Sequence, residues 1–113
     1  MTISRGSWAT KSRMPTARQF LAAATGLDGR IYALGGFVVD PADPRSEQRS
    51  RIVEAYTPST DTWTTVQEMP TARSNLAAAW GPDGRIYAIG GLTGSTSPGG
   101  IESFTSLDVV TCI

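Results

Sequence analysis

One repeat dominates this sequence. The segment Met14–Gly36 is MPTARQFLAAATGLDGRIYALGG, and the segment Met69–Gly91, 55 positions later, is MPTARSNLAAAWGPDGRIYAIGG. The two segments differ at only five positions, and the same offset places Trp8 on Trp63. A period of this length is typical of proteins in which a small unit cannot bury its apolar face alone and stacks on copies of itself. The chain is therefore expected to fold as repeated units.

The repeat predicts an all-β unit of four short strands. Asp28-Gly29 supplies the positive φ angles of a tight hairpin turn, and Thr57–Asp61 has turn chemistry before the last strand. Four antiparallel strands in about 50 residues form the unit of a β-propeller blade. We therefore predict a partial β-propeller of two four-stranded antiparallel blades. The expected strands of the first blade are Phe20–Thr25, Ile31–Leu34, Ile52–Tyr56 and Thr62–Val66.

The strand order is expected to be shifted along the chain. In the second unit a third strand is expected at Ile101–Phe104, and no Trp-bearing fourth strand follows it. An outer strand of the fourth type is expected instead at the start of the chain, around Trp8. We therefore divide a single domain, 1–113, into an outer strand at 1–13, a full repeat at 14–66 and a second repeat at 67–113 that lacks a clear fourth strand.

Charge and composition exclude several classes of function. Lys+Arg and Asp+Glu number ten each, so no net charge attracts nucleic acid or an anionic membrane. The chain has no histidine, the most common general base and metal ligand, and one cysteine, Cys112. No apolar run has the length of an export signal core or a membrane span. We expect no cofactor, no metal, no nucleic-acid partner and no membrane, and a soluble protein with the cytoplasm slightly favoured.

These features resemble the kelch-repeat family. The matching residues are Gly35-Gly36 and Gly90-Gly91 after the second strand, Tyr56 in the third strand and Trp63 in the fourth. Each glycine pair also follows an Ile-Tyr step, and each repeat begins with the same Met-Pro-Thr-Ala-Arg loop. Two departures are Phe104, where the family usually has Tyr, and Leu107–Ile113, which lacks the usual turn and Trp. Kelch proteins close four to eight blades into a ring, commonly six, so the resemblance implies that two blades are part of a propeller.

Most residues that mark the repeat have a structural interpretation. A phosphate-binding role for the double glycines would need a following helix or a Gly-Lys-Ser/Thr sequence, and neither is present. We expect these glycines to allow close backbone packing between blades. Trp8, Trp63 and Tyr56 could stack on a sugar or a base, but outer-strand positions favour burial between blades. Trp80 replaces Thr25 in one copy only, as a local packing residue or as an exposed contact.

Arg18 and Arg73 are candidate binding residues. Each ends the loop between the fourth strand of one blade and the first strand of the next. In kelch domains that bind acidic peptides, arginines at this position face the ligand, and arginine suits bidentate binding of carboxylates. An arginine present in both copies also suits a repeated structural bond to neighbouring backbone. Both alternatives stay open at this point.

The segment Phe37–Arg51, with its polar loop over Asp40–Ser50, supplies the other candidate binding residues: Asp40, Arg45 and Arg49. Its acidic residues lack the glycine and the regular oxygen series of a calcium loop. The kelch arrangement brings this loop and the Met-Pro-Thr-Ala-Arg loop to one face of the ring, where we expect any binding surface. The counterpart Leu92–Gly100 is low in complexity and a poor candidate for a preformed site.

Three functions compete on this basis. The first is a non-catalytic protein–protein interaction or scaffold module that binds a protein partner through the inter-strand loops of one propeller face. The alternative is a fragment of a kelch-type enzyme, similar to galactose oxidase or sialic-acid mutarotases, whose active site lies on absent blades. A third is purely structural, with two blades that matter because they assemble. Two blades leave sheet faces uncovered, which favours association; three chains joined head to tail would form a six-bladed ring.

Overall fold

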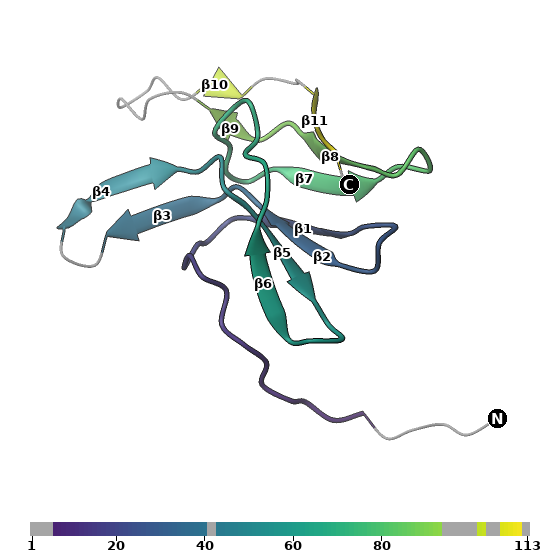
Figure 1. The fold of residues 1–113 in the computed structure, drawn as a ribbon. Coiled ribbons are helices and arrows are strands. Elements are labelled where there is room, and N and C mark those ends of the chain that lie inside the picture. Colours follow the sequence, from purple (N-terminus) through teal and green to yellow (C-terminus); the bar gives the residue numbers. More distant parts are fainter. Residues whose placement is uncertain (1–5, 41–42, 94–101, 104–106, 112–113) are drawn as a thin grey trace.

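The computed structural model describes residues 6–40, 43–93, 102–103 and 107–111 (Figure 1). Across these residues all the regular structure is β-strand in antiparallel pairs, and none of it is helix. Within the same ranges there is accordingly no helical segment of the length and apolar character needed to cross a membrane. The all-β class predicted from the repeat is confirmed.

The first sheet contains four strands in the order β1-β2-β5-β6. Gly29, at φ +80°, closes the turn between β1 and β2, and Asp61, at φ +54°, ends the turn between β5 and β6. Both positions lie in the left-handed region that Gly and Asp tolerate best. These turns give the short hairpin connections expected from the sequence. The strands are β1 (Ala22–Thr25), β2 (Ile31–Leu34), β5 (Val53–Thr57) and β6 (Thr62–Thr65).

The second sheet contains β7 (Ala77–Trp80), β8 (Arg85–Ile89) and β11 (Leu107–Thr111), in the order β11-β8-β7. The third strand beside β8 is therefore β11, and the expectation of a third strand at Ile101–Phe104 is wrong. In this register Asp108 is opposite Ala88, just as Glu54 is opposite Ala33 in the first sheet. Val109, Val110 and Thr111 are β-branched, which favours this segment as the strand.

Two further hairpins lie outside the main sheets. The expected polar loop after Gly36 is largely a hairpin of β3 (Phe37–Asp40) and β4 (Asp43–Arg49), with a register shift between Val38 and Asp40. Figure 1 shows this hairpin projecting from the body of the molecule, away from the turns that join β1 to β2 and β5 to β6. Its counterpart in the second repeat is a short pair of β9 (Leu92–Thr93) and β10 (Glu102–Ser103).

The N-terminal arm, defined here as residues 6–13, forms no strand, in contrast to the expected outer strand around Trp8. Trp8 is 103% exposed, so its expected burial between blades is not seen in this chain. The arm is anchored only near its end, where Ser12 donates through its backbone N to Asp61 Oδ1 at 2.9 Å and Trp63 Nε1 donates to Ser12 O at 2.9 Å. A strand needs a partner edge, and the arm lies beside none (Figure 1).

The hydrophobic core lies between the two sheets. The inner strands β1 and β7, each with three successive alanines, contact one another, and partly buried Ala24 and Ala78 pack against the core. Small side chains at these positions allow the two sheets to approach closely. The first sheet and the second repeat both contribute buried side chains: Tyr32, Leu34, Val53, Ala55, Met69, Ile86 and Ala88.

Candidate functional site

Arg18 lies at the centre of a buried polar cluster on the first sheet. Its side chain is 0% exposed and its Nη2 lies 2.7 Å from Oε1 of Glu54, whose side chain is 2% exposed. Nη1 also donates to the backbone oxygens of Gly35 at 2.8 Å and Ile52 at 2.9 Å. Thr16 donates to the second oxygen of Glu54 at 3.0 Å. The guanidinium therefore ties the loop before β1 to both β2 and β5.

Electrostatics explain why these two residues occur together. Burial lowers the pKa of Arg18, while the charge of Glu54 and its hydrogen bond act in the opposite direction. A buried charged side chain is costly unless a partner of opposite charge and further hydrogen bonds compensate for its lost hydration. Glu54, in strand β5, provides the opposite charge for Arg18, although the Nε of Arg18 is buried without a hydrogen-bond partner.

Arg73 repeats part of this arrangement in the second repeat. It is fully buried, and its Nη1 donates to the backbone oxygen of Gly90 at 2.8 Å, the same bond that Arg18 makes to Gly35. Of the two alternatives left open by the sequence, this geometry favours the repeated structural bond. Contact of either arginine with a ligand stays a prediction.

The first glycine pair, Gly35-Gly36, lies where the first repeat meets the second. The backbone N of Gly36 donates to Arg73 O at 2.7 Å, and a Cβ on Gly35 would lie 2.5 Å from that same oxygen. Gly36 and Gly91 are crowded by their own repeats instead, because a Cβ there would lie 2.7 Å from Gln19 O and 2.6 Å from Ser74 O, respectively. Gly35, Gly36 and Gly91 also have positive φ angles. Their geometry fits the expected close backbone approach and leaves no room for a side chain.

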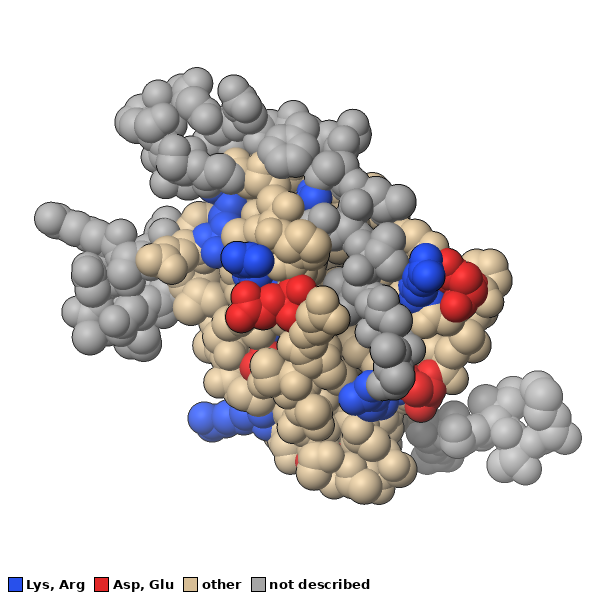
Figure 2. All heavy atoms as spheres, turned by 45° about the horizontal axis from the view of Figure 1, so that its top comes forward, with Lys and Arg blue, Asp and Glu red and all other residues tan. Residues whose placement is uncertain are grey.

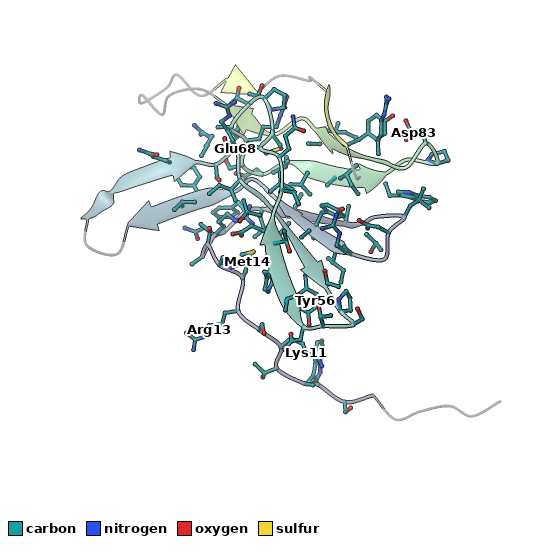
Figure 3. All side chains as sticks on the ribbon, in the orientation of Figure 1. Lys11, Arg13, Met14, Tyr56, Glu68 and Asp83 are labelled. Carbon is teal, nitrogen blue, oxygen red and sulfur yellow. The ribbon has the colours of Figure 1, made fainter. Side chains whose placement is uncertain are left out.

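A second cluster lies at the base of the β3–β4 hairpin, beside the second repeat. Arg49 lies over the Phe37 ring, 5.4 Å from its centroid, and donates from Nε to Ser74 Oγ at 3.2 Å. Arg51 donates from Nε to Met69 O at 3.0 Å and lies 3.7 Å from the exposed carboxylate of Glu68. Figure 3 shows Glu68 on the loop above the first sheet. These contacts hold the hairpin against the second repeat.

Two open hollows flank this hairpin. One, of about 230 Å³, is lined by Ala17, Arg18, Gln19 and Phe37. The other, of about 260 Å³, lies on the β4 side and includes Gln48, Arg49 and Glu68 in its lining. We call the surface of these two hollows, with the exposed residues Gln19, Gln48, Arg51 and Glu68 and the half-buried Phe37, the hairpin face. It combines an aromatic ring, amides and charges of both signs.

Of the predicted binding residues, the structure places Arg49 at the base of the hairpin. Asp40 and Arg45 lie in β3 and β4, but their side chains are outside the described part of the structure. Figure 2 shows basic and acidic side chains next to one another in several places on the surface in view. This mixed surface agrees with the zero formal charge of the chain.

The turns at the other end of the strands carry a repeated polar contact. Asp28 accepts from Arg30 Nε and from Tyr32 OH, both at 2.7 Å. Burial alone would raise the pKa of Asp28, but the hydrogen bonds from Tyr32 and Arg30 outweigh it and hold that pKa at about 2. In the second repeat Tyr87 likewise donates to Asp83, whose pKa is lowered by this bond. These contacts fasten each hairpin turn to its strand.

The aromatic residues separate into three environments. Tyr56 and Trp63 pack together with ring centroids 5.1 Å apart, and Tyr56 OH donates to Asp61 Oδ1 at 2.7 Å. Figure 3 shows Tyr56 near the turn between β5 and β6, with Lys11 of the arm nearby. Trp80 ends β7 and is 46% exposed, which fits the exposed contact rather than a buried filler. Trp8 is free of the body, as described above.

Two features of this region differ from the sequence-based expectation. Glu54 has a buried partner that was not expected, although a single charge inside the apolar run Ile52–Tyr56 is a signal that a buried counter-charge must exist. The segment after Gly36 is not a loop, and Phe37-Val38-Val39 has the β-branched and aromatic content of a strand.

The described residues of this site include no cluster of metal ligands. Among the described residues, no three Asp, Glu or Cys side chains gather closely enough to hold a metal ion. The arrangement can instead offer hydrogen bonds, charges and an aromatic ring to an approaching surface.

The chain matches known proteins along most of its length. The family model "Kelch motif" matches residues 20–70. "Kelch-like protein terF" of Aspergillus terreus is 34% identical over 112 residues, which cover 94% of this chain and 24% of that protein. The "N-acetylneuraminate epimerase" of Pasteurella multocida is 27% identical over 86 residues, covering 75% of this chain and 22% of that protein. The chain thus spans about a quarter or less of these relatives.

A solved structure gives the same fold. "Structure of YjhT" superimposes with a TM-score of 0.67 at 22% sequence identity, over 77% of this chain and 25% of that chain. Successive antiparallel sheets with inner strands in contact define the chain as part of a β-propeller. The paired glycines, the buried arginines and the motif match identify it further: the chain belongs to the kelch-repeat family.

Proposed function

We propose that the chain is a protein-interaction module and that it binds its partner through the hairpin face. The observation that carries this proposal is the position of the β3–β4 hairpin, which projects from the body and is flanked by two open hollows. Loops held by a rigid scaffold are common binding elements. Here the scaffold contacts of Arg49 and Arg51 fix the hairpin base.

The chemistry of the face suits a polar protein surface. Gln48 is exposed, and Arg51 and Glu68 have side chains 53% and 61% exposed, so their charges are available to a partner. Phe37 adds an aromatic ring beside Gln19. Aromatic and arginine side chains are enriched at protein interfaces. The similarity to Kelch-like proteins supports an interaction role for this chain.

Photo-crosslinking tests this proposal. One variant carries a photo-crosslinking amino acid at Gln48, and the control carries it at Thr60, an exposed residue of the turn between β5 and β6 at the other end of the sheet. After irradiation in extract of the source cells, we expect a discrete protein adduct from position 48 alone, identified by mass spectrometry. Excess unlabelled chain should compete, whereas chain with Gln19→Glu and Gln48→Glu, two exposed side chains outside the scaffold contacts, should not. Equal labelling from both positions contradicts the proposal.

The second candidate is that the chain supplies two blades of a kelch-type enzyme. The similarity to the Pasteurella multocida N-acetylneuraminate epimerase favours it. In that case the reacting groups would lie on blades other than these two. The test is NMR observation of N-acetylneuraminate with and without a chimera in which this chain replaces the matching segment of the Pasteurella multocida protein, which supplies the other blades. Faster interconversion of its forms, abolished by heat denaturation, would favour the enzyme over the interaction module.

Self-association belongs to the same proposal. We include head-to-tail assembly of copies, up to a trimer that closes as a six-bladed ring. The uncovered sheet faces at both ends of the unit support it, because such faces favour association. Light scattering after size exclusion tests it, with a mass near three times 12.0 kDa expected for the ring.

A further inference from the structure

Among the described residues, none pairs with the outer edge of β11, the edge that faces away from β8. In the first sheet, β5 pairs with β2 on one edge and with β6 on the other. In the second sheet, β11 occupies the place of β5 and pairs with β8, but no described residue pairs with its other edge. An open edge of this kind accepts another strand of suitable sequence.

The N-terminal arm carries a sequence that matches the missing neighbour. In the first sheet that neighbour is β6, Thr62-Trp63-Thr64-Thr65, and the segment 55 positions earlier is Ser7-Trp8-Ala9-Thr10. The arm segment is exposed and lies in no strand. Its backbone groups are therefore free to pair with an edge.

The arm of the same chain is badly placed for this role. Ser12 is held at the tip of the first sheet by Asp61 and Trp63. Figure 1 shows the arm leaving on the side of the first sheet that faces away from the second sheet. The first sheet thus stands between the arm and the edge of β11, so the arm of the same chain does not reach this edge, whereas the arm of a second copy can.

The outer face of the first sheet and the outer face of the second sheet, called the end faces here, are also complementary to one another. Ile31 on the outer face of the first sheet is 40% exposed, whereas its repeat equivalent Ile86, which packs against the first sheet, is 0% exposed. Conversely, Leu34 is 0% exposed inside, whereas its equivalent Ile89 on the outer face of the second sheet is 43% exposed. A second copy packed head to tail would bury both exposed residues in the way their equivalents are already buried within one chain.

On the basis of the interaction role proposed above, we infer that the partner of these end faces is a second copy of this chain, which adds residues 7–10 of its arm to β11. The register follows from the first sheet, where Glu54 is opposite Thr65 and Tyr56 is opposite Trp63. Because β11 pairs with β8 as β5 pairs with β2, the register of β6 on β5 can be transferred to the arm on β11. It places Thr10 of one copy opposite Asp108 of the other, Ala9 opposite Val109 and Trp8 opposite Val110. The contact is directional, so it forms rings or open chains rather than a two-fold dimer.

Mixed single-cysteine variants test this inference. In a Cys112→Ser background, Ala9→Cys chains are mixed with Val109→Cys chains under mild oxidation. The pair is opposite in the proposed register, so we expect a disulfide-linked heterodimer of about 24 kDa. The control mixes Ala9→Cys chains with Thr60→Cys chains, for which we expect at most a tenth of that yield. Similar yields in the two mixtures would refute the register.

Two further measurements separate the alternatives. The double variant Ala9→Cys/Val109→Cys should form intermolecular links, and an intramolecular disulfide at monomer mass would show that the arm folds back on its own chain. Ile89→Glu should weaken association about tenfold or more, since it puts a charge on the end face. Ile89 is already exposed in the single chain, so the monomer should keep its fold, checked by circular dichroism. A mass of 12.0 kDa at every concentration would overturn the inference.

This test and the test of the hairpin face are independent. Ile89→Glu should leave crosslinking from Gln48 unchanged. A variant that loses self-association but keeps crosslinking is affected at the end faces. A variant that loses crosslinking but keeps self-association is affected at the hairpin face.

Discussion

Breaking the buried ion pair between Arg18 and Glu54 should be one of the most destabilising single changes in the described structure. We propose the perturbation Glu54→Ala, with Asp28→Ala as a matched control. Both carboxylates lie 2.7 Å from an arginine nitrogen. The side chains of the first pair are 0% and 2% exposed, whereas those of Arg30 and Asp28 are 21% and 31% exposed. Distance is therefore the same in the two cases and burial differs.

The expected magnitudes follow from that difference. Removing one partner of a buried pair leaves an uncompensated charge and costs about 3–5 kcal/mol. In Glu54→Ala the guanidinium keeps its bonds to the oxygens of Gly35 and Ile52, which places the cost near the lower end of that range. The partly exposed pair at Asp28 should contribute about 1 kcal/mol or less, because water screens it. We therefore expect Glu54→Ala to cost at least about 2 kcal/mol more than Asp28→Ala.

Urea unfolding followed by tryptophan fluorescence measures both costs. Every variant is compared at one fixed chain concentration, because association would add to the apparent stability. Domains of this kind are stable by about 5–15 kcal/mol, so Glu54→Gln serves as a milder variant if Glu54→Ala does not fold. The double variant Arg18→Met/Glu54→Leu should cost less than the sum of the two single changes. Equal costs for Glu54→Ala and Asp28→Ala would refute the reasoning.

Three further predictions concern other contacts. The pKa of Asp28 is lowered from 3.8 to about 2 in the folded chain, so its stabilising contribution is present above about pH 4 and is lost as the pH falls through 2. Asp28→Asn should flatten the acid unfolding profile over this window, and an unchanged profile would contradict the prediction. Gly35→Ala should lower the free energy of unfolding more than Gly90→Ala. Both glycines have φ near +65°, but a Cβ on Gly35 would lie 2.5 Å from Arg73 O, whereas nothing lies within 4 Å of a Cβ on Gly90. Equal shifts of the urea midpoint would argue against this packing. Asp61→Ala should speed hydrogen exchange at the Ser12 amide, whose acceptor it removes, with Asp83→Ala as a control that leaves this amide unchanged.

The strands of the first sheet could be predicted from the sequence to within two residues at every strand end. Ile31–Leu34 is the same in both, and Ile52–Tyr56 is shifted by one residue to Val53–Thr57. These strands follow from local signals, namely β-branched runs bounded by Asp-Gly and Pro-containing turns. The period itself located the glycine pairs, and Gly35 is crowded by Arg73 O where the first repeat meets the second.

Features that depend on pairing could not be predicted in this way. The similarity of Ile101–Phe104 to Ile52–Tyr56 indicated a third strand there, but the edge of β8 is taken by Leu107–Thr111. Trp8 has the sequence of an outer strand, yet residues 6–13 form none, because a strand also needs an edge. The Arg18–Glu54 pair joins residues 36 positions apart, and no local pattern specifies such a partner.

The alanines of β1 and β7 also set the angle between neighbouring blades. Where two blades meet at their inner strands the side chains are small, and Ala24 and Ala78 pack against a core of larger side chains that includes Tyr32, Leu34 and Ile86. The distance between neighbouring inner strands helps to set the angle between blades and hence the number of blades that fit around a circle. A larger residue at Ala78 would therefore do more than fill space, since it would reduce the curvature of the array and shift it toward a ring of more blades. Three small side chains on each inner strand thus have a direct influence on the circumference of any ring these repeats can build.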